Sequence, residues 1–219
     1  MLRCTEETLW AFGVDDPIDV LGHSQGGVAA LAFTLEHPDR VRRLLLVNTS
    51  SGGPAFMRAR GAIWNRTHPD FWRFAVRATI FMLIRRSGAE LWMNNLIFRD
   101  SFVDRSWFAP EPISWRQWLQ PPRPRSKWGS SIARKIDYGA RLADIHVPTL
   151  VTTGRFDPQM PPDCATELAA RIPNARLVVF ERSGHYPFIE EPDTFWSTVE
   201  RFLRGRRHDI SSASCASIR

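Results

Sequence analysis

The stretch that decides the fold is Gly22-His23-Ser24-Gln25-Gly26-Gly27. It comes directly after residues 17–22, a β-rich run that predicts a strand, and it opens residues 25–37, where apolar side chains recur at helical spacing. A G-x-S-x-G string between a strand and a helix forms a sharp turn that exposes its serine. We therefore predict that Ser24 projects from this turn as a nucleophile.

The residues around Ser24 have predicted parts in this turn. A Cβ at position 22 or 26 should collide with the turn, so Gly22 and Gly26 form the predicted elbow together with His23, which we expect to be a structural hydrogen-bonding residue. The backbone N–H of Gln25 lies at a helix N-terminus, where it can stabilise a developing oxyanion. The alternative is a glycine-rich turn that contains a serine by chance.

A serine hydroxyl needs a general base and a group that orients the base. Asp157 follows a predicted strand at residues 147–153, and His185 lies in the loop after a predicted strand at residues 177–180. The chain order Ser24, Asp157, His185 predicts a catalytic triad. Each of the two later residues also has a simpler interpretation on its own, Asp157 as an acid before Pro158 at a helix start and His185 as a surface loop residue.

Strand and helix patterns alternate at both ends of the chain. A fourth apolar run at residues 41–48 predicts a strand buried on both faces, and residues 163–171 and 193–203 predict helices. Such βαβ units give an α/β fold with a mostly parallel sheet. Because parallel strands end at the same edge, the triad candidates should meet there.

The middle of the chain has a different composition. Residues 54–142 hold 16 basic and 6 acidic residues and seven of the nine tryptophans, with several helix starts. We predict that this cap segment (residues 54–142) is a helical lid inserted between two core parts, residues 1–53 and 143–204, with a stiff connector at 121–124 and a disordered tail at 205–219. Its candidate substrate-binding residues are Trp64, Trp72 and Trp92.

The charge and composition limit the partners. The net charge of +6 comes from the cap segment, whose interleaved apolar residues favour amphipathic helices with a buried face, so we expect no nucleic-acid partner. The arginines of the cap segment either meet an anionic group of the substrate or are simply solvated. No apolar run reaches the roughly 20 residues of a membrane span.

The motifs and the cysteine spacing indicate which cofactors and which compartment to expect. We find no metal-ligand spacing, no dinucleotide or phosphate-loop string and no readable signal peptide, so we expect no metal and no cofactor. Cys4, Cys164 and Cys215 are an odd number at wide spacings, which suits reduced thiols in the cytoplasm.

The motifs together resemble the α/β-hydrolase fold, over residues 17–51 and 144–204. The resemblance implies hydrolysis of a small-molecule ester or amide by Ser24, His185 and Asp157 beneath a helical cap. Serine at the elbow separates the chain from epoxide hydrolases and haloalkane dehalogenases, which use aspartate there. The second half, with Gly-Arg-Phe-Asp157-Pro and Ser-Gly-His185, is most similar to proline iminopeptidases.

The resemblance also implies about four strands ahead of the nucleophile strand and a loop that supplies a second oxyanion donor. Only residues 1–16 precede the predicted strand. We expect either an N-terminally truncated fragment or a shortened relative, with a partial sheet whose first strand is an exposed edge that could pair two copies. A catalytically weak or inactive protein with a binding or vestigial role is the alternative to a serine hydrolase.

Overall fold

The computed structural model describes residues 2–84, 86–121 and 135–205. The predicted stiff connector from residue 122 onward and the predicted tail from residue 206 onward lie outside these residues.

A parallel sheet of four strands forms the centre of the fold. The strands are β1 (Ile18–His23), β2 (Val41–Val47), β3 (Thr149–Gly154) and β4 (Ala175–Phe180), and they lie in the order β1-β2-β3-β4. In the register, Gly22 is opposite Leu46, Leu45 is opposite Leu150, and Val151 is opposite Leu177. The predicted α/β fold with a partial parallel sheet is confirmed, and the predicted strand boundaries shift by one or two residues.

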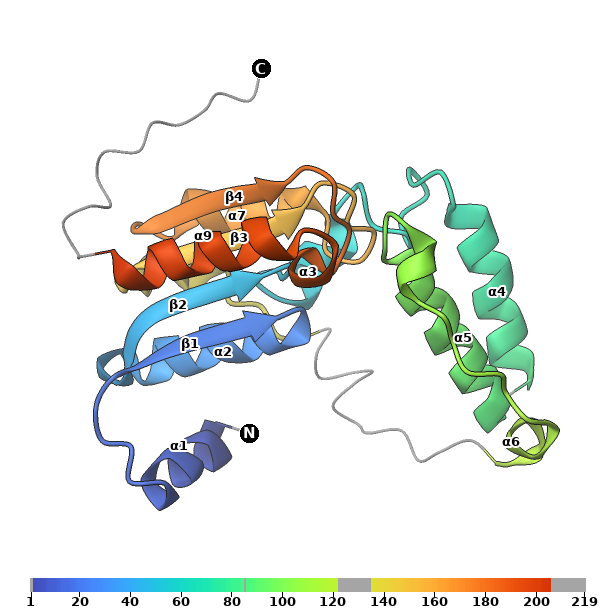
Figure 1. Cartoon of the computed structure of the whole chain (residues 1–219), viewed down its shortest axis with the longest axis horizontal. Helices are drawn as coiled ribbons and strands as arrows, with labels where there is room; N and C mark the ends of the chain where they lie inside the picture. Colours follow the sequence, from blue (N-terminus) through green and yellow to red (C-terminus); the bar gives the residue numbers. More distant parts are fainter. Residues whose placement is uncertain (1, 85, 122–134, 206–219) are drawn as a thin grey trace.

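Helices cover both faces of this sheet (Figure 1). On one face, α2 (Gln25–Glu36) and α7 (Pro162–Arg171) pack against Leu44 and Leu46 of β2. On the other, α9 (Pro192–Arg204) packs against Leu45 and Val47. Alternate residues of β2 thus enter different cores, which explains why its sequence is continuously apolar.

The remaining helices lie at the start of the chain, between the strands and after β4. The first is α1 (Leu2–Ala11), which ends before Gly13 at a φ of 65°. Short 3₁₀ helices occupy Pro38–Arg40, Arg105–Trp107 and Gly139–Asp144, and α8 (Pro187–Glu190) precedes α9. Between β2 and β3 lie α3 (Gly53–Arg58), α4 (Phe71–Ile84), α5 (Ser87–Asp100) and α6 (Trp115–Leu119).

Helices α4, α5 and α6 stand beside the end of the sheet to which the strand arrows point (Figure 1). All four strands therefore direct the residues that follow them toward these helices. None of the described helices is both long and apolar enough to cross a bilayer.

Candidate active site

Ser24 lies in the turn between β1 and α2 with a strained backbone. Its φ is 54° and its ψ is −125°, a conformation that costs energy for a residue with a side chain. Three hydrogen bonds hold it there. The Ser24 N–H donates to Val47 O at 3.0 Å, and Ser24 O accepts from Gly27 N at 3.0 Å and Thr49 Oγ1 at 2.6 Å. The strand-to-helix turn predicted from the sequence is present.

The glycines of this turn differ from the prediction in one respect. A Cβ on Gly22 would lie 2.6 Å from Gly27 Cα and collide with Gly26 O, as predicted. A Cβ on Gly26 would meet nothing within 4 Å, so the predicted collision at that position is wrong. The second tight position is Gly27, where a Cβ would lie 2.5 Å from Thr49 Cβ. The position in α2 that has no room for a side chain is therefore Gly27, one residue later than the motif suggests.

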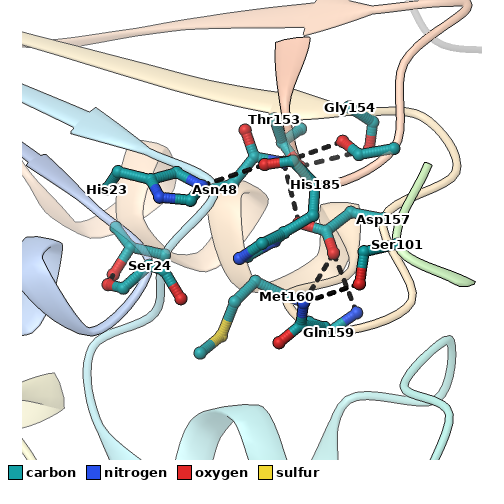
Figure 2. Close-up of polar contacts among 12 residues, drawn as sticks. His23, Ser24, Asn48, Ser101, Thr153, Gly154, Asp157, Gln159, Met160 and His185 are labelled. Carbon is teal, nitrogen blue, oxygen red and sulfur yellow. Dashed lines mark hydrogen bonds and ion pairs between the residues drawn. The ribbon is translucent and has the colours of Figure 1, made fainter. Parts of the chain in front are cut away.

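His185 and Asp157 form a buried pair. His185 Nδ1 lies 2.7 Å from Asp157 Oδ2, and their side chains are 2% and 0% exposed. A carboxylate oxygen accepts, so Nδ1 carries a proton and donates it, and Nε2 is the ring nitrogen left to act as a base. In Figure 2 this ring points from Asp157 toward the Ser24 side of the site. Ser24 and His185 are both among the described residues, and no hydrogen bond joins the Ser24 hydroxyl to the His185 ring. Hydrogen bonds between a nucleophile and its general base are often long before substrate binds.

The Asp157 carboxylate accepts four hydrogen bonds. Oδ1 accepts from Gln159 N at 2.8 Å and Met160 N at 2.9 Å. Oδ2 accepts from His185 Nδ1 and from Asn48 Nδ2, each at 2.7 Å. These four donors fix the orientation of the carboxylate. Sequence reasoning missed Asn48; its one signal is a polar residue directly after the apolar run of β2.

His23 contacts both the backbone and the ring of His185. Its Nε2 lies 2.9 Å from His185 O, and the two ring centroids are 4.7 Å apart. Burial lowers the pKa of His23, which keeps its ring neutral. Because a carbonyl oxygen only accepts, Nε2 of His23 carries the proton. This contact agrees with the predicted role of His23 as a structural hydrogen-bonding residue.

The cap segment touches the candidate site through Ser101. The Ser101 carbonyl oxygen accepts from His185 N at 2.8 Å, and its hydroxyl accepts from Gln159 Nε2 at 2.7 Å (Figure 2). The carboxylate of Glu190 accepts from Val103 N and Gly184 N, both at 2.7 Å. The segment after α5 is therefore tied to the loops that carry both Asp157 and His185.

Three arginines of the cap segment surround one acid next to Ser101. The Asp100 carboxylate lies 2.7 Å from Arg77 Nη1, 3.2 Å from Arg99 Nη2 and 3.4 Å from Arg105 Nε. The cluster carries more positive than negative charge. Arg77, Asp100 and Ser101 also line a cleft.

The three tryptophans predicted to bind substrate have different surroundings. Trp64 donates from Nε1 to Phe56 O at 3.2 Å and packs edge-on against the Phe56 ring. Trp72 on α4 is 71% exposed, and Trp92 on α5 is partly buried. Their part in substrate binding stays a prediction.

The fold and this edge of the sheet define the class of the protein. A family model described as the alpha/beta hydrolase family matches residues 3–198, and the chain belongs to this family.

The chain is similar in sequence to curated hydrolases. The chain is 30% identical over 200 residues to a 2-hydroxy-6-oxononadienedioate/2-hydroxy-6-oxononatrienedioate hydrolase of Cupriavidus pinatubonensis, over 87% of this chain and 65% of that protein. It is 33% identical over 194 residues to a 2-hydroxymuconate semialdehyde hydrolase of a Pseudomonas species, over 84% of this chain and 61% of that protein. The chain thus spans less than two thirds of the length of both relatives.

Solved structures share the fold. An alpha/beta fold family hydrolase from Bacillus anthracis superimposes with a TM-score of 0.73 at 20% identity, covering 92% of this chain and 72% of that one. A meta-cleavage product hydrolase from Pseudomonas fluorescens gives a TM-score of 0.63 at 23% identity, covering 90% and 67%. Identities this low support the fold alone.

Proposed function

We propose that the protein is a serine hydrolase in which Ser24 attacks a carbonyl carbon, His185 transfers the proton and Asp157 orients His185. The observation that carries the proposal is the buried 2.7 Å contact between His185 Nδ1 and Asp157 Oδ2. It leaves Nε2 of His185 as the base, at the same edge of the sheet as the strained Ser24 turn.

The proposed reaction follows from these positions. Nε2 of His185 takes the Ser24 proton while the serine oxygen bonds to the carbonyl carbon. The N–H of Gln25, the first residue of α2, donates to the oxyanion. His185 then gives the proton to the leaving group, and water releases the acyl group from Ser24 by the same steps in reverse order.

We propose an acidic substrate with a scissile bond next to a carbonyl group. The Cupriavidus relative is named for a dioate, and a Nitrosomonas europaea relative, 28% identical over 83% of this chain and 69% of its own length, is named a methyl ester esterase. The arginines around Asp100 add positive charge beside the site. The proline iminopeptidase-like specificity and the ester or amide bond itself stay predictions.

The domain division also stays a proposal. The position of α4, α5 and α6 beside the carboxyl ends of the strands (Figure 1) supports a lid formed by residues 54–142 between core parts 1–53 and 143–204. Pairing of two copies along β1 is supported by its place at the end of the strand order, where β2 is its one partner strand among the described residues. The oligomeric state in solution tests this pairing.

A binding or vestigial protein with an unused triad is the competing function. A fluorophosphonate probe separates the two, since only an activated serine is labelled. We expect labelling of this chain and of Ser197→Ala, an exposed serine on α9 that serves as the matched control, and none of Ser24→Ala. Absence of labelling in the unmodified chain would favour the binding role.

A substrate panel tests the chemistry and the charge preference together. Neutral p-nitrophenyl esters, carboxylate-bearing esters and 2-hydroxy-6-oxodienoates are compared across a salt series. We expect activity that depends on Ser24 and a preference for anionic substrates that weakens as salt screens the arginines. Full activity in Ser24→Ala would refute the mechanism, and equal rates for neutral and anionic esters at every salt concentration would show that the arginines are simply solvated.

A further inference from the structure

Asn48 occupies a special position at the end of β2. It is fully buried and adopts a φ of 47°, in the left-handed region that asparagine tolerates better than most residues. Its N–H donates to Thr152 O of the neighbouring strand β3 at 2.9 Å. This backbone turns the side chain toward the loops that follow β3 and β4.

The side-chain amide of Asn48 joins those two loops. Nδ2 donates to Asp157 Oδ2 at 2.7 Å and to Gly184 O at 3.1 Å (Figure 2). Both partners are acceptors, so the nitrogen of the amide must face them. Among the described residues, Oδ1 of Asn48 is buried with no hydrogen-bond partner. An unpaired buried oxygen is unfavourable, so this orientation depends on the two bonds that Nδ2 donates.

The contact with Asp157 has a mechanical consequence. The two backbone donors of Gln159 and Met160 hold only Oδ1 of that carboxylate, about which the group could pivot. Asn48 holds Oδ2, the oxygen that accepts from His185. The bond to Gly184 O fixes the residue directly before His185. One amide therefore sets the acid and the base relative to each other.

We propose that Asn48 is a positioning residue for the hydrolytic reaction: by holding Asp157 Oδ2 and Gly184 O together, it keeps Nε2 of His185 directed at Ser24. This inference rests on the proposed function, because it assigns Asn48 a part in proton transfer between Ser24 and His185. A purely structural asparagine would instead contribute only to folding.

Two variants separate these roles. Asn48→Gly keeps the left-handed backbone without strain and removes the amide, whereas Asn48→Asp keeps the shape and replaces both donated hydrogen bonds with a carboxylate. Thr34→Ala is the matched control, since Thr34 is buried and donates to Ala30 O at 2.8 Å within α2. Thermal melts identify any variant that fails to fold.

We expect kcat to fall roughly 10- to 100-fold in Asn48→Gly, the range for a lost hydrogen bond to a charged group, with KM unchanged. The acidic limb of the kcat/KM profile should move to higher pH in Asn48→Gly and further in Asn48→Asp, because the negative charge beside the imidazole is less neutralised and then increased. Thr34→Ala should keep the unmodified profile. Unmodified kcat and pH profiles in both folded Asn48 variants would overturn the proposal.

A measurement that does not require turnover completes the test. The Nδ1–H proton of His185 should give a slowly exchanging NMR signal in the unmodified protein and in Ser24→Ala. It should exchange faster with water in Asn48→Gly, where Asp157 Oδ2 can pivot. Equal exchange rates would refute the positioning role even if no substrate is found. Full activity of Ser24→Ala together with faster exchange in Asn48→Gly would refute the proposed function and leave the effect of Asn48 on His185 standing.

Discussion

Replacement of Gly22 by alanine should destabilise the protein strongly. The new Cβ would lie 2.6 Å from Gly27 Cα and 2.7 Å from the Gly26 carbonyl carbon. This is about 1 Å closer than the roughly 3.5–4.0 Å at which carbon atoms pack. The opposing atoms are backbone and cannot rotate away, so β1 and the start of α2 must separate. We expect the free energy of unfolding to fall by about 3 kcal/mol, which is the upper end of the usual cost of overpacking.

Gly26→Ala is the matched control, because its Cβ would meet nothing within 4 Å. Alanine is the better helix former, so this variant should be as stable as the unmodified protein or up to about 1 kcal/mol more stable. Urea unfolding followed by tryptophan fluorescence measures both. In a thermal melt, the Tm of Gly22→Ala should be about 6–12 °C below that of the unmodified protein, since a chain of this size loses about 2–4 °C per kcal/mol. Equal losses in the two variants would refute this view of the turn.

Two further predictions concern buried titratable groups. Burial lowers the pKa of His23, so the unfolded chain binds the proton more readily than the folded protein. The contribution of neutral His23 to the free energy of unfolding is therefore fully present above roughly pH 6.5 and is lost as the pH falls below that value. His23→Gln, which keeps a donor for His185 O, should show a weaker fall in urea midpoint from neutral to mildly acidic pH, and equal slopes would contradict this. Burial raises the pKa of Cys164 to about 12, so iodoacetamide should modify this thiol only in concentrated denaturant, as peptide mass spectrometry would show.

Local patterns sufficed to predict much of the fold. The run Leu44-Leu45-Leu46-Val47 predicts a buried strand because its alternate side chains enter the cores on the two faces of the sheet. Ser24, Asp157 and His185 could be assigned to one edge, since each follows a predicted parallel strand. The 2.7 Å contact between Asp157 and His185 agrees with that expectation of proximity.

The features that sequence reasoning missed depend on neighbours from distant parts of the chain. Gly27 is tight because Thr49, beyond β2, lies against it, whereas the Cβ position of Gly26 faces open space. Asn48 contacts Asp157 across 109 positions of sequence, and only the pairing of β2 with β3 brings the two together. Neither the contact of Gly27 with Thr49 nor that of Asn48 with Asp157 can be predicted from residue spacing along the chain.

The bonds of Ser101 limit how this protein could be spliced with its relatives. By sequence, Ser101 belongs to the stretch between β2 and β3 that a designer would graft from another family member to change substrate preference. Its carbonyl oxygen accepts from His185 N and its hydroxyl accepts from Gln159 Nε2. A graft that shifts this position by one residue would displace the carbonyl oxygen and put a different side chain in place of the Ser101 hydroxyl. The downstream splice junction therefore belongs before Ser101, so that Ser101 is inherited with the sheet rather than with the exchanged helices.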